Sequence, residues 1–244
     1  MPTVIQATTA EDVPDKPVDG KPTLVYWDLV GLVQPARLAL VYAGVDFVDV
    51  RIEYGELTSP EGGAAWRMAK TGKLAQVMPF PNLPYYLDNT IGAIAQTNAI
   101  LHHIGRAHDL MGNQPHMTDF WMDQLTDLEA ALVRLAYGKG PADIIEWYKK
   151  DVPGILAKFS ATLRGNFLTG DKPTVADFKF YSFLYKMTCI QQDLGTPDTE
   201  GVLTLDMVTY MKRIEELPNI KEYMASSVYQ KRPINNVMAK WIGN

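Results

Sequence analysis

The stretch that most constrains this chain covers residues 79–108, because its hydrophobic pattern changes period halfway along. Residues 85–87 favour a β-strand, residues 88–90 are a turn signal, and residues 91–94 can return as a second strand. Beyond them the apolar period becomes that of a helix. The apolar face of that helix consists of Ile100, Ile104, Ala107 and Met111. The pattern therefore predicts a β-hairpin followed directly by a helix.

Two features of this stretch are suited to holding a peptide-like ligand. Gln96 and Thr97 stand at the start of the helix, where free N–H groups and the positive end of the helix dipole favour a carboxylate. If the Leu83-Pro84 bond is cis, the backbone of Leu83 can face outward and pair with a ligand as one more strand. From the residues alone, an ordinary hairpin and a helix with a polar cap are the alternative.

The segment before this hairpin indicates a βαβ unit. Residues 24–27 predict a short strand, and residues 35–42 predict a helix with Gly44 just past its end. Residues 47–52 alternate in polarity, with Asp49 and Arg51 on the face opposite the valines. Strands joined through a helix pair in parallel, so the complete order is βαβ-ββα, which is thioredoxin-like.

From residues 113–115 onward the chain reads almost entirely as helices. An apolar stripe predicts the core face of a helix that ends before Gly138. The stripe consists of Met117, Trp121, Leu125, Leu128, Leu132 and Leu135. Further on, Thr174 and Asp177 have the spacing of a capping box ahead of another apolar helix, which is a structural role.

Composition excludes several classes of protein. The chain has 244 residues, 47% of them hydrophobic and 21% charged, as in ordinary globular proteins. A net charge of −5 without basic runs argues against a nucleic-acid or membrane partner. Cys189 is the single cysteine, which favours a reducing compartment, and the four histidines show no metal-binding motif. Residues 1–20 lack a signal peptide's apolar core and predict a flexible N-terminal extension.

Three segments carry a resemblance to a known family. PNLPYYLD and AQTNAILHHIGRAH, together with YWDLVGLVQPAR at residues 26–37, resemble cytosolic glutathione S-transferases, the mu class most of all. The resemblance extends over residues 22–244. It implies a thioredoxin-like glutathione-binding domain at residues 21–112 and an all-helical domain at residues 113–244 that forms the electrophile pocket.

The resemblance also implies roles for individual residues. Tyr26 would be catalytic, because a hydroxyl aimed at the glutathione sulfur stabilises the thiolate, which is the nucleophile; without the family, Tyr26 could be a packed strand tyrosine. Asp127 would reach the glutathione of a second subunit, or else be a solvated carboxylate. The other glutathione-binding positions would be Trp27, Leu32, Trp66, Lys70, Asn82, Leu83, Pro84, Gln96 and Thr97, and the electrophile pocket would include Tyr137, Asn235 and Asn236.

The chain departs from the family pattern in the loop that would bind the glycyl end of glutathione. Gly63 stands where the family has an arginine, and the connection from Lys70 to Phe80 is about three residues longer. Lys70 could instead be a solvated lysine. The two tail asparagines likewise replace residues that shape the electrophile pocket.

Together these observations predict a glutathione transferase that conjugates the thiolate of glutathione to small hydrophobic electrophiles, in detoxification. We expect a cytoplasmic homodimer with glutathione as co-substrate, without a metal or another cofactor, and without a nucleic-acid or membrane partner. Two alternatives are a non-catalytic ligand-binding or structural subunit of the same fold, and a glutathione-dependent isomerase.

Overall fold

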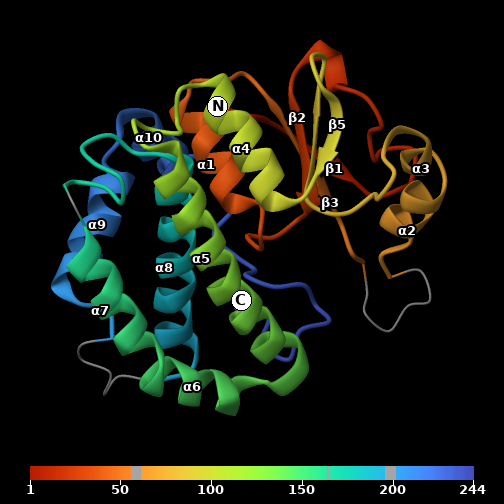
Figure 1. Cartoon of the computed structure of the whole chain (residues 1–244). Helices are drawn as coiled ribbons and strands as arrows, with labels where there is room; N and C mark the ends of the chain where they lie inside the picture. Colours follow the sequence, from red (N-terminus) through yellow and green to blue (C-terminus); the bar gives the residue numbers. More distant parts are fainter. Residues whose placement is uncertain (56–61, 164, 196–201) are drawn as a thin grey trace.

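The computed structural model describes the chain except for residues 56–61, 164 and 196–201. A sheet with helices on both faces forms the first part of the chain, and helices alone form the second (Figure 1). Helices α1 and α4 cover the face of the sheet turned toward the second part, whereas α2 and α3 lie beyond the other face. The expected thioredoxin-like part followed by an all-helical part is confirmed.

The sheet has five strands in the order β1-β3-β2-β4-β5. Strand β3 runs parallel to both β1 and β2, and β4 runs antiparallel to β2 and β5. The predicted βαβ unit and hairpin are therefore both present. The strands are β1 Thr3–Ala7, β2 Thr23–Trp27, β3 Val48–Ile52, β4 Tyr85–Asp88 and β5 Gly92–Ala95.

The first twenty residues correct the expectation of a flexible extension. β1 pairs with β3 along its whole length, with Ile5 opposite Val50. Beyond it Val13 is buried against the sheet, and the Tyr85 hydroxyl donates a hydrogen bond to the Pro14 carbonyl at 2.5 Å. The segment is short and rich in polar residues, so its own pattern is weak. It becomes a strand because the fold leaves the edge of β3 free for pairing.

In the described part of the chain, four α-helices and a short 3-10 helix, Val18–Gly20, accompany the sheet. The α-helices are α1 Gln34–Tyr42, α2 Ala64–Thr71, α3 Leu74–Val77 and α4 Thr97–Ala107. Helix α4 buries Ile100 and Ile104 as predicted, but it ends at Ala107, so Met111 lies beyond the helix. The chain turns there because Asp109 adopts a left-handed conformation with φ of 56°.

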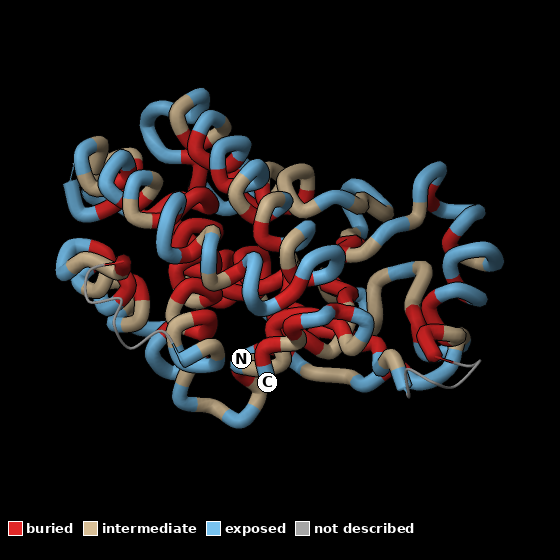
Figure 2. Tube along the Cα trace, turned by 90° about the horizontal axis from the view of Figure 1, so that it is seen from below, coloured by how far each residue is buried: buried red, intermediate tan, exposed pale blue. Residues whose placement is uncertain are grey.

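The second part contains α5 Pro115–Arg134, α6 Pro141–Lys150, α7 Val152–Thr162, α8 Val175–Asp193, α9 Leu205–Glu215 and α10 Pro218–Ala225. Helix α8 is buried along most of its length, and the buried residues gather in the middle of the molecule (Figure 2). The capping box at its start is confirmed, because Asp177 Oδ2 accepts hydrogen bonds from the Thr174 N–H and hydroxyl, both at 2.7 Å. Burial raises the pKa of the Asp177 carboxyl.

The apolar stripe of α5 is rotated relative to the prediction. Trp121, Leu125 and Leu132 are buried as expected, but Met117 and Leu128 are only half-buried. The buried face includes Glu129 instead. In the described part of the chain, no helix is both long enough and apolar enough to cross a bilayer.

A buried cluster of charges lies between α1 and β3. Arg37 Nε donates to Asp49 Oδ2 at 3.0 Å, and both side chains have no exposed surface. Arg51 Nε donates to the same oxygen at 2.8 Å and Arg51 Nη2 reaches the Val228 carbonyl of the tail at 2.6 Å. The alternation in β3 therefore does not separate a buried from an exposed face, because the polar side chains of the strand are covered as well.

We predict that Asp49→Asn lowers the free energy of unfolding by about 3–5 kcal/mol, because it leaves Arg37 buried without its counter-charge and removes the nearer of the two carboxylates beside Arg51. Urea unfolding measures the loss. The matched control is Asp46→Asn, which breaks the exposed Lys21–Asp46 pair and should leave the unfolding midpoint unchanged. Equal midpoints for both variants would contradict the importance of the buried cluster.

Candidate active site

Tyr26 lies near the end of β2, below the loop of residues 28–33. Its hydroxyl oxygen accepts a hydrogen bond from the Leu32 N–H at 3.4 Å. Burial raises the pKa of Tyr26 well above its ordinary value and outweighs the opposite effect of the Leu32 hydrogen bond. The hydroxyl is therefore protonated at neutral pH, and no residue in the described part of the chain accepts its proton, so it can donate to a ligand.

The loop beside Tyr26 is held by the C-terminal tail. The N–H groups of Val30 and Gly31 donate to the carbonyls of Pro233 and Ile234 at 2.9 and 3.0 Å. Gly31 has a φ of 42°, and a Cβ atom there would lie 2.4 Å from the ring of Tyr26. Only glycine permits this close approach, so loop, tyrosine and tail form one packed unit.

A cavity of about 120 Å³ opens next to Tyr26. It brings together several of the predicted residues from distant segments. Its lining consists of Tyr26, Leu29, Gly31, Leu32, Glu129, Leu132, Val133, Tyr137, Lys186 and Asn235. Asn236 is not in this lining; its N–H donates to the Tyr137 hydroxyl oxygen at 3.0 Å and so anchors the tail.

The sequence reasoning missed Glu129 and Lys186 in this lining. Lys186 Nζ lies 2.9 Å from Glu129 Oε1, and both side chains are only 5% exposed. A signal existed in the sequence. Glu129 falls on the helical spacing between Leu125 and Leu132, and Lys179 and Lys186 stand seven residues apart on one face of an apolar helix.

Trp66 and Lys70, which were predicted to bind glutathione, belong to α2, beyond the face of the sheet that α1 and α4 leave uncovered. Trp66 is buried, stacking on Tyr85 with ring centres 6.2 Å apart and meeting Trp27 edge-on at 6.5 Å. Lys70 is exposed, with its ammonium 5.8 Å from the centre of the Trp66 ring. Trp66 is thus largely a core residue, and Lys70 and Trp27 are the more accessible of the three.

Gly63 explains why this chain lacks the arginine of the family pattern. Its φ is 70°, a conformation that strains residues with a side chain. A Cβ atom there would also lie 3.1 Å from the ring of Tyr54. The local backbone therefore disfavours any larger residue at this position.

The hairpin and α4 present the remaining predicted residues. The Leu83-Pro84 peptide is cis, as the prediction required, and the Leu83 N–H donates to Asn82 Oδ1 at 3.0 Å. Gln96 is exposed just before α4 begins, and Thr97 is its first residue. Their accessible N–H groups and the Thr97 hydroxyl can hold a carboxylate.

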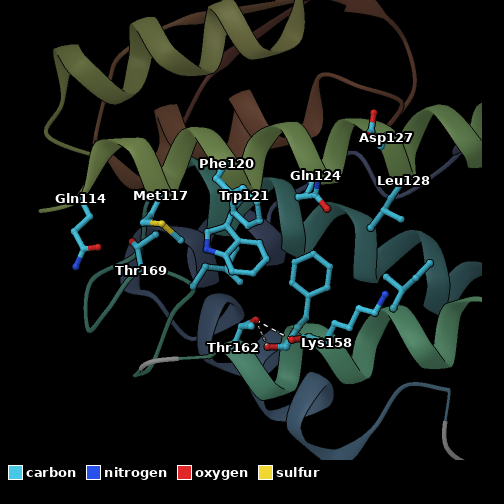
Figure 3. A pocket seen from close by; sticks show the side chains of 13 residues that line it. Gln114, Met117, Phe120, Trp121, Gln124, Asp127, Leu128, Lys158, Thr162 and Thr169 are labelled. Carbon is cyan, nitrogen blue, oxygen red and sulfur yellow. Dashed lines mark hydrogen bonds between the residues drawn. The ribbon is translucent and has the colours of Figure 1, made fainter.

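Asp127 lies apart from these residues, exposed on α5 at the border of a second cavity of about 600 Å³. In Figure 3 its carboxylate points away from the middle of that cavity, which Met117, Trp121 and Leu128 line on the α5 side. Within this single chain Asp127 does not line the Tyr26 cavity.

Comparisons with known proteins agree with this architecture. The family model for the glutathione S-transferase C-terminal domain matches residues 126–227. A glutathione S-transferase of Tyrophagus putrescentiae is 33% identical, and the match covers 93% of this chain and 99% of that protein. Human glutathione S-transferase Mu 3 is 32% identical, covering 89% of this chain and 94% of that protein.

A solved structure extends the agreement to three dimensions. The pi-class glutathione S-transferase of Onchocerca volvulus has a TM-score of 0.72 at 26% identity, covering 90% of this chain and 99% of that one. A thioredoxin-like sheet joined to a helical bundle is thus the shared class of fold. This chain belongs to the glutathione S-transferase family.

We predict that Gly31→Ala displaces the Tyr26 ring, because the added methyl would sit 2.4 Å from it. The expected loss in the free energy of unfolding is about 1–3 kcal/mol, measured by urea unfolding. Gly154→Ala on α7 is the control, since its methyl meets nothing within 4 Å and should slightly stabilise the helix. If both variants keep the stability of the wild type, the loop does not depend on glycine.

Proposed function

We propose that this protein is a glutathione transferase that conjugates glutathione to small hydrophobic electrophiles, with Tyr26 as its catalytic residue. The observation that carries the proposal is a protonated tyrosine hydroxyl, set in the wall of a largely apolar cavity, whose proton has no acceptor among the described residues. A donor aimed at sulfur favours the thiolate over the thiol. The reaction needs glutathione as co-substrate and calls on no metal or redox cofactor.

Glutathione would bind along the hairpin and the start of α4. Its γ-glutamyl carboxylate meets Gln96 and Thr97, and its cysteinyl backbone pairs with Leu83 beside Asn82 and Pro84. The glycyl carboxylate lies toward Trp27 and Lys70, with Leu32 and Trp66 packing around the site. This arrangement directs the sulfur toward the Tyr26 hydroxyl.

The chemical step is a nucleophilic addition or substitution. The thiol proton leaves to solvent, and the thiolate then attacks the electrophilic carbon. An S–C bond forms while a leaving group departs or a π bond opens. Tyr26 contributes by stabilising the sulfur anion, and the protein contributes by holding both reactants in contact. Tyr137 and Asn235 line the electrophile side, and Asn236 anchors Tyr137.

A homodimer in the cytoplasm is part of the proposal. The cavity between α5 and α7 is lined mostly by apolar side chains, and Phe80, next to the predicted glutathione residues, is 85% exposed. Apolar surface of this kind is usually covered by a partner. A second copy placed over it by two-fold symmetry would also bring Asp127 to the neighbouring glutathione site.

One experiment separates this function from its rivals. The protein is applied to immobilised glutathione and then assayed for conjugation of 1-chloro-2,4-dinitrobenzene. Retention with turnover supports the transferase, and retention without turnover supports a binding subunit. A glutathione-dependent isomerase would bind glutathione without consuming it. Failure of both retention and turnover would contradict the proposal.

We predict that Tyr26→Phe lowers conjugation at pH 6.5 about 3- to 10-fold while glutathione affinity stays nearly intact. Losing a hydrogen bond to a charged group, about 1.5–3 kcal/mol, raises the pKa of the bound thiol by roughly 1–2 units. The thiolate fraction then falls about 10- to 100-fold. The more basic thiolate is a better nucleophile, however, and this offsets roughly half of the rate loss on a logarithmic scale.

The measurement is the pH–rate profile of the variant. The difference in rate between the variant and the wild type should shrink as pH rises toward the raised thiol pKa, because the thiolate fraction of bound glutathione in the variant then approaches that in the wild type. A profile that overlays the wild type would mean that Tyr26 is only a packed strand residue.

We predict that Phe80→Glu converts the dimer to monomers, because a charge cannot enter an apolar interface without a partner. Light scattering at micromolar concentration measures the mass. The control is Leu205→Glu, which changes another highly exposed apolar residue, on α9, and should leave the protein with the mass of a dimer.

Asp127→Ala should weaken glutathione binding without changing the mass of the protein. A wild-type protein that is monomeric would refute this part of the proposal.

A further inference from the structure

The chain before β2 contributes structure to which the proposed function gives no role. The resemblance to glutathione S-transferases begins at residue 22, whereas β1 pairs with β3 at residues 3–7. At the end of β1, the Glu53 N–H donates to the Ala7 carbonyl at 3.0 Å. The chain leaves the edge of the sheet there. Residues 8–14, the N-terminal segment, then make contacts that reach α2.

The N-terminal segment begins with a turn that the Asp12 carboxylate closes. Asp12 Oδ2 accepts the N–H groups of Thr8 and Thr9 at 3.1 and 2.8 Å, and the Thr9 hydroxyl at 2.9 Å. Side chains that hydrogen-bond nearby backbone groups in this way stabilise turns. The turn therefore sets the course of the backbone from Glu11 to Pro14.

Val13 belongs to the hydrophobic core on which α2 packs. Its side chain has no exposed surface, and it lies in one buried cluster with Ala65, Trp66 and Ala69. These three are the buried residues of α2. The packed face of α2 thus shares its core with the N-terminal segment, so a loss of apolar volume at Val13 leaves a cavity in that core.

Two hydrogen bonds attach the N-terminal segment to α2 and its surroundings. Lys73, two residues past the end of α2, donates through Nζ to the Glu11 carbonyl at 3.0 Å. The Tyr85 hydroxyl donates to the Pro14 carbonyl at 2.5 Å, and the Tyr85 ring stacks on Trp66 of α2. The segment is therefore joined to the C-terminal end of α2 and to the ring against which α2 packs.

The position of α2 matters because Lys70 projects from it. Lys70 is exposed, and its ammonium lies 5.8 Å from the centre of the Trp66 ring on the same helix. In the proposed site this ammonium meets the glycyl carboxylate of glutathione. A lysine is a point charge on a flexible stem, so its backbone must be held if it is to meet a fixed carboxylate. When the binding-competent arrangement is only partly populated, the apparent affinity falls in proportion.

We propose that the N-terminal segment is a positioning element for glutathione recognition, because it holds α2 where Lys70 can bind the glycyl carboxylate. This inference rests on the proposed function, from which it takes the placement of glutathione. The γ-glutamyl and cysteinyl positions, residues 96–97 and 82–84, lie at the start of α4 and just before β4. Their contacts therefore persist when α2 loosens. The segment supports the binding of glutathione but not of γ-glutamylcysteine, which lacks the glycine.

The test is a double variant, Asp12→Ala with Val13→Ala, which opens the turn and removes core volume but leaves β1 in place. Calorimetric titration measures Kd for glutathione and for γ-glutamylcysteine. Complete loss of a hydrogen bond to a charged group weakens binding about 10- to 100-fold. A loosened helix keeps part of that contact, so we expect Kd for glutathione to rise about 3- to 10-fold and Kd for γ-glutamylcysteine to change less than about 2-fold.

Steady-state kinetics with 1-chloro-2,4-dinitrobenzene give a second measure of the same variant. The KM for glutathione should rise as its Kd does, whereas kcat at saturating glutathione should equal that of the wild type. The reason is that the segment acts on the binding of the glycyl end and not on the sulfur beside Tyr26.

The matched control is Val152→Ala, which makes the same change in an equally buried valine, on α7. It should lower the free energy of unfolding but leave both Kd values unchanged. The conservative pair Asp12→Asn with Val13→Ile keeps the acceptor and the apolar volume, so it should bind both peptides as the wild type does.

A second variant keeps the test decisive if the first does not fold. Lys73→Met with Tyr85→Phe removes both hydrogen bonds to the N-terminal segment but retains the apolar part of each side chain. It should raise Kd for glutathione about 2- to 5-fold, because neutral hydrogen bonds contribute less than the charged contact that they position.

A double-mutant cycle with Lys70→Met shows whether the effect runs through Lys70. Lys70→Met alone should raise Kd for glutathione about 10- to 100-fold. In this background the change at Asp12 and Val13 should add nothing, because the contact that the segment positions is already lost. Effects that add in full would mean that the segment acts on the fold in general, and would overturn the inference.

The outcomes separate this inference from the function on which it rests. If the wild type is neither retained on immobilised glutathione nor active in conjugation, the proposed function fails. If the wild type is retained but binds both peptides equally, or if the segment variants change Kd for both peptides alike, the positioning role is overturned. A loss confined to glutathione, and absent in Val152→Ala, supports it.

Discussion

The structure depends on the buried carboxylate of Asp49, which holds two arginines from different elements. Arg37 belongs to α1 and also donates to the Leu29 carbonyl of the loop above Tyr26 at 2.9 Å. Arg51 belongs to β3 and bonds the tail at Val228 and Gln230. Buried ion pairs contribute little net stability, but breaking one is costly, so they specify one arrangement. Here the arrangement fixes the loop and the tail that enclose the site.

A second polar network joins the two parts of the chain near the predicted carboxylate site. Lys179 of α8 bonds Asn98 of α4 and Thr126 of α5, and Asn98 Nδ2 in turn donates to Asp123 Oδ1 at 3.0 Å. Burial lowers the pKa of Lys179, while Glu129 acts in the opposite direction. The network sets the position of the first turn of α4 relative to the helices that carry the electrophile cavity.

The cavity itself combines apolar walls with a few available donors. The hydroxyl oxygens of Tyr26 and Tyr137 each accept a backbone N–H, from Leu32 and Asn236, and within the described ranges neither hydroxyl donates to another protein group. Burial raises the pKa of both phenols, so they stay donors through the neutral range. Both hydroxyls border the same cavity, where they can donate to a ligand.

Local sequence determined those features whose partners lie within a few residues along the chain. The hairpin of residues 85–95, helix α1 and the Thr174–Asp177 capping box follow from residue type, spacing and turn chemistry, so they could be predicted with their approximate bounds. The family motifs also indicated Tyr26, Tyr137 and Asn235, which the fold brings together in one cavity. Their roles remain inferences that the motifs suggested.

Only the tertiary structure decided the features whose partners are far apart in the chain. The strand β1 exists because β3 offers a free edge more than forty residues away. The face that α5 buries, and with it the contact between Glu129 and Lys186, 57 residues apart, depends on how α8 packs against it. A periodic pattern predicts that a helix has a buried face. A charged residue on that face is stable only if a residue far along the chain supplies its counter-charge. No local pattern encodes that contact, because burial and pairing arise together when the helices pack.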